Sequence, residues 1–299
     1  GLSENNAKKT ISAGVNAAKT IYENVVLVKP GLYTGGSNRG INFNGYNIKL
    51  RSMGNASNTI IDLERSGPFV NLNSGETLVS WLDGFTIRNG FRDSNGIAIN
   101  LDGAALDIRN CIFINNNSGT KYTYDYGDGY VETFWEGGYA TAAIYAKGGP
   151  VRIFNTIFRN NSSRGSMYGG GEESNAGALN IVDARGTIID KCEFSNNMGM
   201  GAGAIILIAS EAEITDSRFN SNIGLGNGGA IATPYTFYYY MLEYEGGGSV
   251  APNNVVLKNC LFYGNQGKSD YSDLYFEYST LAGLYNTTMA GGKNGNIGY

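Results

Sequence analysis

The sequence contains no histidine, the residue that serves most often as a general base and as a nitrogen ligand for metals. Proline is scarce, at 5 of 299 residues, and charged residues make up only 16%. No apolar run approaches the length that spans a membrane. The net charge of −4 comes without a basic stripe, so we expect neither nucleic-acid binding nor membrane insertion.

Cysteine is nearly absent as well, and its 3 copies share one position of a repeat. Cys111, Cys192 and Cys260 stand where other copies of the repeat carry Thr or Ser. The Ser217 copy separates Cys192 from Cys260, which puts them outside disulfide reach. The sequence therefore predicts small, buried, unreactive cysteines.

The sequence is rich in glycine, with 44 copies, and contains a repeat of roughly 25 residues. The cleanest copy is 201–222, GAGAIILIASEAEITDSRFNSN. The first five copies begin with an Ala-Ile or Ala-Leu pair, and all six end with a large apolar residue, here called the anchor. An aliphatic residue lies five positions before each anchor, and Asn lies three positions after each Phe anchor. The anchors are Phe113, Phe158, Phe194, Phe219, Phe262 and Met289, preceded by Ile87.

Short apolar runs alternate with Gly, Asn and Ser corners and show no helical spacing, which indicates a coil of short stacked strands. Equivalent positions of successive turns then lie about 4.8 Å apart. We predict an all-β fold, a single-stranded right-handed parallel β-helix (solenoid), as one domain covering residues 1–299. Its interior should hold ladders of Phe, of aliphatic residues and of small residues. A ladder of stacked structural amides should comprise Asn115, Asn160 and Asn196 together with Asn116, Asn161, Asn197, Asn222 and Asn265.

Two short motifs, GGAI at 228–231 and FxxN at 219–222, resemble the repeats of polymorphic outer membrane proteins. More broadly, the chain resembles the right-handed parallel β-helix (pectate-lyase-like) superfamily. This resemblance implies the fold strongly and the function weakly. Polysaccharide-active members carry Asp pairs, His-bearing motifs or calcium carboxylates on the coil face, and no such set can be matched here.

Residues 8–22 predict a short amphipathic helix with Ile11, Val15, Ala18 and Ile21 on one face. This helix would cap the first coil and hide its exposed strand edge. The first six residues have neither the basic start nor the apolar core of a signal peptide, and no Met begins the sequence. We therefore expect a processed or trimmed chain.

The remaining boundaries follow from the repeat. Residues 1–22 form the cap, 23–86 form irregular first coils, 87–289 form regular repeats and 290–299 form a tail. Within the first coils, 25–33 is expected to be one apolar strand closed by Pro-Gly, and 41–43 is expected to be a further short strand.

Intervals between anchors that exceed the repeat reveal three insertions, 120–140, 164–175 and 234–249. The first two occupy the same corner of adjacent coils, so they should rise side by side, whereas the third leaves from another corner. Loops on a rigid scaffold commonly carry function.

Aromatic residues crowd the first and third insertions and suit a contact surface, because Tyr combines apolar area with a polar tip. Sugar stacking and a protein interface fit equally well. The main hypothesis is a non-catalytic extracellular or cell-surface protein, such as an adhesin, a binding module or an assembly subunit. Its partner would be a surface polysaccharide, a protein or another copy of the chain. The predicted contact residues are Tyr122, Tyr124, Tyr126, Tyr130, Trp135, Tyr139, Tyr235, Tyr238, Tyr239 and Tyr240.

An alternative hypothesis is a polysaccharide hydrolase or lyase that uses carboxylates of the first insertion. Its candidates are Asp125, Asp128, Glu132 and Glu136. A third hypothesis is an open-ended filament subunit. We expect no cofactor and no metal, although acidic loop residues leave an oxygen-only Ca²⁺ site open.

Overall fold

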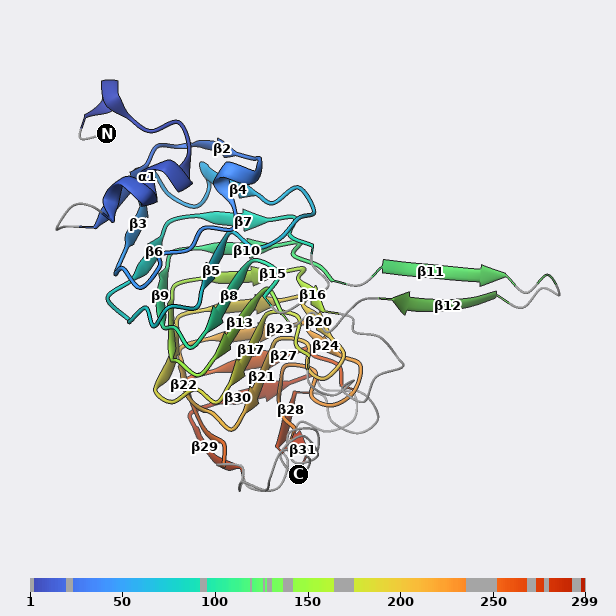
Figure 1. Ribbon diagram of the computed structural model, residues 1–299. Helices are drawn as coiled ribbons and strands as arrows, with labels where there is room; N and C mark the ends of the chain where they lie inside the picture. The colour runs from blue at the N-terminus through green and yellow to red at the C-terminus, as the bar shows by residue number, and fades with distance from the viewer. Residues whose placement is uncertain are drawn as a thin grey trace, which may run out of the picture.

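A computed structural model describes residues 3–19, 24–91, 96–118, 120–125, 127, 131–136, 142–163, 175–234, 252–267, 273–276, 280–291 and 297–298. The chain winds through successive turns, here called rungs, each of which adds one strand to each of three long parallel sheets (Figure 1). The protein is the parallel β-helix that the sequence predicts.

Within a regular rung the chain passes from sheet C to sheet A and then to sheet B. Sheet A contains, in spatial order, β1 (Val25–Val28), β3 (Lys49–Ser52), β6 (Trp81–Asp83), β9 (Leu106–Arg109), β14 (Val151–Phe154), β18 (Thr187–Asp190), β22 (Glu211–Thr215), β26 (Asn254–Lys258) and β29 (Leu281–Tyr285). Sheet B contains β2 (Gly31–Tyr33), β4 (Thr59–Asp62), β7 (Thr86–Arg88), β10 (Ile112–Ile114), β15 (Ile157–Arg159), β19 (Glu193–Ser195), β23 (Arg218–Asn220), β27 (Leu261–Tyr263) and β30 (Thr288–Ala290).

Sheet C contains β5 (Val70–Leu72), β8 (Ile99–Asp102), β13 (Ile144–Lys147), β17 (Leu179–Val182), β21 (Ile205–Ile208), β25 (Ile231–Thr233), β28 (Leu274–Phe276) and β31 (Ile297–Gly298). A small sheet D contains β16 (Ser162–Ser163), β20 (Met198–Gly199) and β24 (Ile223–Gly224). The last strand, β31, pairs with β28, so this part of the tail returns to sheet C.

The predicted ladders are confirmed by the strand register. Phe113, Phe158, Phe194, Phe219 and Phe262 are register partners in sequence and are fully buried. Their rings stack nearly parallel, with centroids 4.5 to 4.9 Å apart, which is the strand spacing itself. The coil interior therefore contains a continuous column of Phe side chains, and a second register column runs through Ile108, Ile153, Ile189 and Ile214.

The amide ladder is confirmed for five buried members, whereas the predicted members Asn115, Asn160 and Asn196 are exposed and have a left-handed backbone (φ 54° to 56°). The side-chain nitrogen of Asn161 donates to the side-chain oxygen of Asn197 (3.0 Å) and to the carbonyl of Phe113 (3.0 Å). The same pattern recurs in every rung from Asn116 to Asn265. The ladder thus satisfies buried corner backbone that would otherwise be costly.

The predicted capping helix is present as α1 (Ile11–Ala18), preceded by a 3-10 turn η1 (Glu4–Asn6). Thr10 caps its first turn by accepting a hydrogen bond from the Ala13 amide, and Ile11, Val15 and Ala18 are buried as expected. Ile21 lies outside the described residues.

Two strand predictions in the first coils were wrong. The apolar run 25–33 is two strands, β1 and β2, because Pro30 and Gly31 turn the chain from sheet A into sheet B. Residues 41–43 form no strand, and Ile41 contributes only an isolated bridge to Val70. A second 3-10 turn, η2 (Gly36–Asn38), precedes this segment.

The first insertion contains an antiparallel hairpin of β11 (Thr120–Asp125) and β12 (Val131–Glu136) that projects away from the coil (Figure 1). The flanks of the first two insertions stack on each other, since Asn117 bridges Ser162 and the Ala143 amide donates to the Gly177 carbonyl. Both insertions therefore leave the coil at the corner after sheet B.

Candidate functional site

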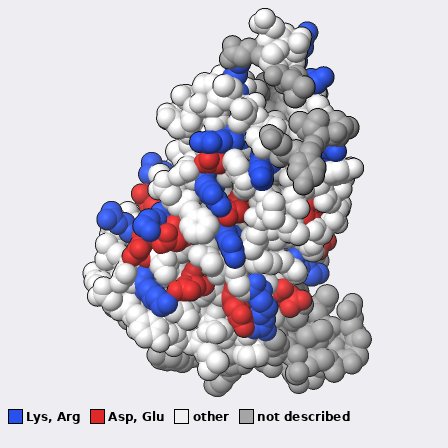
Figure 2. All heavy atoms as spheres, turned by 90° about the vertical axis from the view of Figure 1, so that its left-hand side faces the viewer, with Lys and Arg blue, Asp and Glu red and all other residues white. Residues whose placement is uncertain are grey.

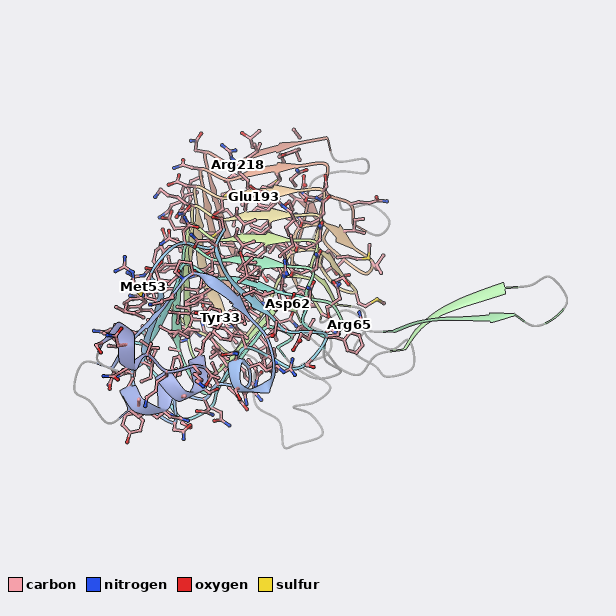
Figure 3. The ribbon with its side chains drawn as sticks, turned by 90° about the horizontal axis from the view of Figure 1, so that it is seen from above. Tyr33, Met53, Asp62, Arg65, Glu193 and Arg218 are labelled. Carbon is pink, nitrogen blue, oxygen red and sulfur yellow. The ribbon has the colours of Figure 1, made fainter. Side chains whose placement is uncertain are left out.

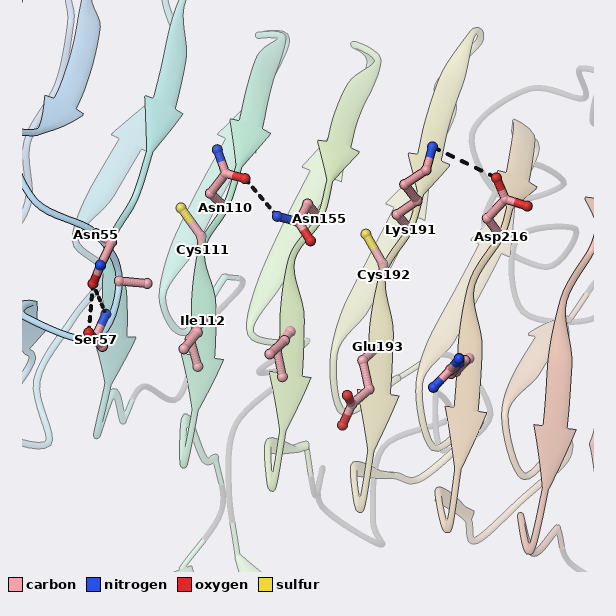
Figure 4. A pocket seen from close by; sticks show the side chains of 13 residues that line it. Asn55, Ser57, Asn110, Cys111, Ile112, Asn155, Lys191, Cys192, Glu193 and Asp216 are labelled. Atoms are coloured by element: carbon pink, nitrogen blue, oxygen red, sulfur yellow. Dashed lines mark hydrogen bonds and ion pairs between the residues drawn. The ribbon is translucent and has the colours of Figure 1, made fainter.

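A groove of about 560 Å³ runs across the strands at the corner between sheets A and B. Figure 4 shows its lining side chains as a row contributed by successive rungs. The polar lining residues are Asn55, Ser57, Asn110, Asn155, Lys191, Glu193, Asp216 and Arg218. The groove thus follows the long direction of the coil.

The groove exists because the regular corner is only two residues long. Asn110, Asn155, Lys191 and Asp216 each occupy its first position with φ between 46° and 52°. This left-handed conformation is one that Asn and Asp tolerate better than most residues. The second position points inward and is taken by the Cys, Thr or Ser of the repeat. A tight, repeated turn leaves a continuous depression beside it.

One end of the groove is formed by a longer corner. Between β3 and β4 the turn covers residues 53–58 instead of two residues. The side-chain oxygen of Asn55 accepts hydrogen bonds from the Ser57 amide (2.9 Å) and hydroxyl (2.6 Å), which fixes this wall.

Amide side chains line the middle of the groove. Asn155 donates to the side-chain oxygen of Asn110 (2.8 Å), and Asn110 donates to Asp83 (2.7 Å). Because a side-chain amide offers two donor hydrogens and two acceptor lone pairs, each keeps hydrogen-bonding capacity toward a ligand.

Charges on the neighbouring outer face of sheet A alternate in sign, as Figure 2 shows. Lys191 in the groove belongs to this pattern, with its ammonium 3.0 Å from Asp190 and 3.8 Å from Asp216. Glu193 is paired with Arg159 at 3.2 Å. Such exposed pairs add little stability but neutralise one another's charge.

Arg218 differs from these residues. Within the described part of the chain its guanidinium has no ion-pair or hydrogen-bond partner, and its side chain is exposed. It follows Glu193 in register on the adjacent strand of sheet B, and both residues lie on the outside of the coil (Figure 3). Arg218 is therefore the cation that the groove offers to a ligand.

Lys191, which lines the groove, and its neighbour Asp190 hold each other in their charged forms. Burial alone would raise the pKa of Asp190, but hydrogen bonds from Thr215 and Lys191 and the charge of Lys191 hold it below its ordinary value. The hydrogen bond to Asp190 raises the pKa of Lys191. Both groups are ionised at neutral pH, so this pair is not arranged as a proton donor and acceptor.

Two cysteines lie in the floor of the groove. Burial raises the pKa of Cys111 and of Cys192 to about 12. The Cys111 thiol donates to the Arg109 carbonyl (3.1 Å). Because the thiolate is the reactive form, both are unreactive core residues, as the sequence predicts.

The predicted loop residues are placed only in part. Tyr122, Tyr124, Trp135, Asp125, Glu132 and Glu136 belong to the hairpin β11–β12, whose backbone is described. The acidic residues are not register partners of one another, since Asp125 pairs with Val131, Glu132 with Tyr124 and Glu136 with Thr120. Lying outside the described residues are Tyr126, Asp128, Tyr130, Tyr139, Tyr235, Tyr238, Tyr239 and Tyr240.

The hairpin and the groove lie at opposite ends of the sheet B strands. The groove precedes β10 at Asn110, whereas the hairpin follows β10 at Thr120. Within the described residues, no group of three or more His, Cys, Asp or Glu side chains could hold a metal ion. In that same part of the chain no helix is long and apolar enough to cross a membrane.

Comparisons with known proteins find likeness in structure alone. No family model and no curated protein matches the chain. A pectin methylesterase mutant in complex with hexasaccharide IV aligns at 13% identity and a TM-score of 0.46, covering 99% of this chain and 91% of that one. Pectin methylesterase from Yersinia enterocolitica aligns at 11% identity and a TM-score of 0.44, covering 96% of this chain and 93% of that one.

A mannuronic acid specific polysaccharide family 6 lyase from human gut microbiota aligns at 13% identity and a TM-score of 0.37, covering 92% of this chain and 81% of that one. At these identities and TM-scores no residue role or activity transfers to this chain. The resemblance of the repeats to polymorphic outer membrane proteins stays a prediction, because no family model matches.

The corner groove was not predicted from the sequence, which pointed to the three loop insertions as the candidate sites. Its polar lining residues come one or two per rung and differ in chemistry, so they do not form a motif. The available signal was the position three before each anchor, which holds Asn110, Asn155, Lys191, Asp216, Asn259 and Asn286.

Proposed function

We propose that the protein is a non-catalytic module that binds an extended acidic polysaccharide along the corner groove, outside the cell or at its surface. The observation that carries this proposal is the repetition of one polar corner in four successive rungs, about 4.8 Å apart. A sugar polymer likewise presents hydroxyl groups at regular intervals along its length. Amides in a row fit such a ligand because they both donate and accept hydrogen bonds.

The preference for an acidic polymer rests on Arg218. Lys191 is neutralised by Asp190 and Asp216, whereas Arg218 has no partner within the described residues. A guanidinium binds a carboxylate through two parallel hydrogen bonds, so a uronate group fits it. Glu193 is ion-paired with Arg159, and the pKa of Asp190 lies below its ordinary value. A general acid needs a raised pKa, so these carboxylates support binding more than acid catalysis.

Binding can be measured by titration calorimetry with oligogalacturonate, and with a neutral β-glucan oligosaccharide as the comparison ligand. We expect Arg218→Gln to weaken oligogalacturonate binding about tenfold or more, since a charged hydrogen bond contributes about 1.5–3 kcal/mol. Arg185→Gln is the matched control, because Arg185 is also exposed but pairs with Glu211 outside the groove lining.

A second pair of variants tests the amide row without backbone strain. Asn155→Gly removes a groove amide, and Asn286→Gly removes the equivalent amide outside the groove lining, at nearly the same φ (46° and 47°). Only the first should weaken binding. Tighter binding of the neutral glycan would contradict the proposal that the ligand is acidic. No binding of either glycan would contradict the proposed binding function. New reducing ends or unsaturated products would favour the enzyme hypothesis.

A further inference from the structure

A second groove, of about 490 Å³, lies between α1 and β1 at the N-terminal end of the coil. Its helical wall includes Ile11, Gly14, Ala17 and Ala18, and its other wall is the whole of β1. The helix and strand approach closely at Gly14, where a β-carbon would lie 3.2 Å from Val26 Cγ1. The groove is unrelated to the corner groove and shares no lining residue with it.

The strand wall is the outer edge of the nine-stranded sheet A. The carbonyls of Asn24 and Val28 accept hydrogen bonds from the Lys49 and Met53 amides of the β3 side. Because alternate residues of a parallel strand face opposite neighbours, the backbone groups of Val25 and Leu27 face away from β3. The side chains of these two residues are 36% and 58% exposed, so this edge is apolar as well as unpaired by β3. The helix therefore leaves the edge open, contrary to the expectation that it would hide it.

The rim of this groove carries charge of one sign. Lys8, Lys9 and Lys29 line it, and no Asp or Glu is among its lining residues in the described part of the chain. A strand edge on one wall and a helix on the other is the geometry in which an extended peptide adds a strand to a sheet.

We propose that an extended segment of a partner protein, apolar in the middle and acidic at its ends, docks beside β1 as an added strand of sheet A. Its backbone pairs with Val25 and Leu27, and its acidic ends lie near the lysines. The competing role for these lysines is protection of the edge against any pairing, and that role predicts no peptide binding.

The probe is a fluorescein-labelled peptide of sequence EETVTVEE, with KKTVTVKK as its charge-reversed control, and the measurement is fluorescence anisotropy with the full chain. We expect saturable binding of the acidic peptide only. The double variant Lys8→Glu, Lys9→Glu should weaken it at least tenfold. Lys147→Glu is the matched control, because Lys147 is an exposed lysine at the end of β13 in sheet C.

Leu27→Pro removes one edge amide without removing a hydrogen bond to β3, so it should also weaken binding. The circular dichroism spectrum of this variant must match that of the unaltered protein, which shows that the fold is kept. If the spectra differ, the test of the proposal is the Lys8→Glu, Lys9→Glu variant. Amide exchange gives an independent readout, because bound peptide should slow exchange at Val25 or Leu27. Absent binding, equal binding of both peptides, or binding unchanged by the lysine reversal would overturn the proposal.

Discussion

Single residues in this coil are constrained by the residues directly above and below them. Gly177, Gly203 and Gly229 show this most clearly, because they are equivalent residues of three successive rungs. A β-carbon on Gly203 would overlap the carbonyl oxygen of Gly229, and one on Gly177 would lie 2.6 Å from that of Gly203. Glycine is therefore required at 177 and 203 by the stacking of rungs and not by a left-handed backbone.

Asp273 is a residue that the repeat pattern did not predict. In the next rung Asp273 occupies the position equivalent to Ala230. The pair there is Asp273-Leu274, where the preceding rungs have Ala-Ile or Ala-Leu. Its carboxyl group is fully buried and accepts a hydrogen bond from Asn265 (2.8 Å), and its second oxygen has no hydrogen-bond partner among the described residues. A single unlike residue in a repeat carries no periodic signal, which is why its role emerges only from the structure.

The first prediction concerns pH. Burial raises the pKa of Asp273, with the Asn265 hydrogen bond opposing it in part. A raised folded-state pKa means that this group's contribution to stability is full below its unfolded pKa, about 3.9, and is lost as pH rises through the folded value. Asp273→Asn should thus gain stability relative to the unaltered protein between pH 4 and pH 7, as measured by urea denaturation. Asp102→Asn, at an exposed position, is the control. If the stability difference between Asp273→Asn and the unaltered protein does not change with pH, the pKa of Asp273 is not raised by folding.

At the scale of elements, strands were predictable wherever an inward side chain repeats. The Phe and Asn columns were placed correctly because one residue per rung must fill the same interior volume. The division of 25–33 into β1 and β2 was not predicted, because a single apolar run passes through the corner at Pro30. The corner groove was not predicted either, since it depends on turn shape and the side chains around it vary.

The second prediction concerns the Phe column. Phe219 stacks between Phe194 (4.8 Å) and Phe262 (4.5 Å), and the backbone register holds both neighbours in place. The cavity left by Phe219→Ala cannot collapse, so we expect a loss of about 3–5 kcal/mol. Met289→Ala, at the half-buried end of the column, should cost less than half as much. Urea denaturation measures both values, and equal losses would show that stacking is not what stabilises the column.

At the scale of the whole molecule, each rung contacts mainly its neighbours, so stability should accumulate rung by rung. Thr187 and Ala212 are register partners. Removal of residues 187–211 would therefore place β22 where β18 lies and set Phe219 on Phe158.

The third prediction is that this shortened chain folds. Its circular dichroism should keep the same shape, while its urea midpoint should fall because one rung interface is lost. Removal of 187–199 alone starts at the same residue but breaks the register, and it should give an aggregated or unfolded product. If both deletions behave alike, stacking in register does not govern this fold.

The amide column has a direction as well as a position. From Asn116 to Asn265 one N–H of each side-chain amide is oriented toward the following amide, and the last one meets the carboxyl group of Asp273, while the first oxygen receives the Gly90 amide. The other N–H of each amide donates to a backbone carbonyl of the preceding rung. Five parallel amides sum to an electric moment along the solenoid axis, just as peptide units do in an α-helix, with the Asp273 carboxyl group at its positive pole. The two poles of the solenoid are thus electrically distinct, and any rung added beyond Asn265 must supply an acceptor to extend that polarity.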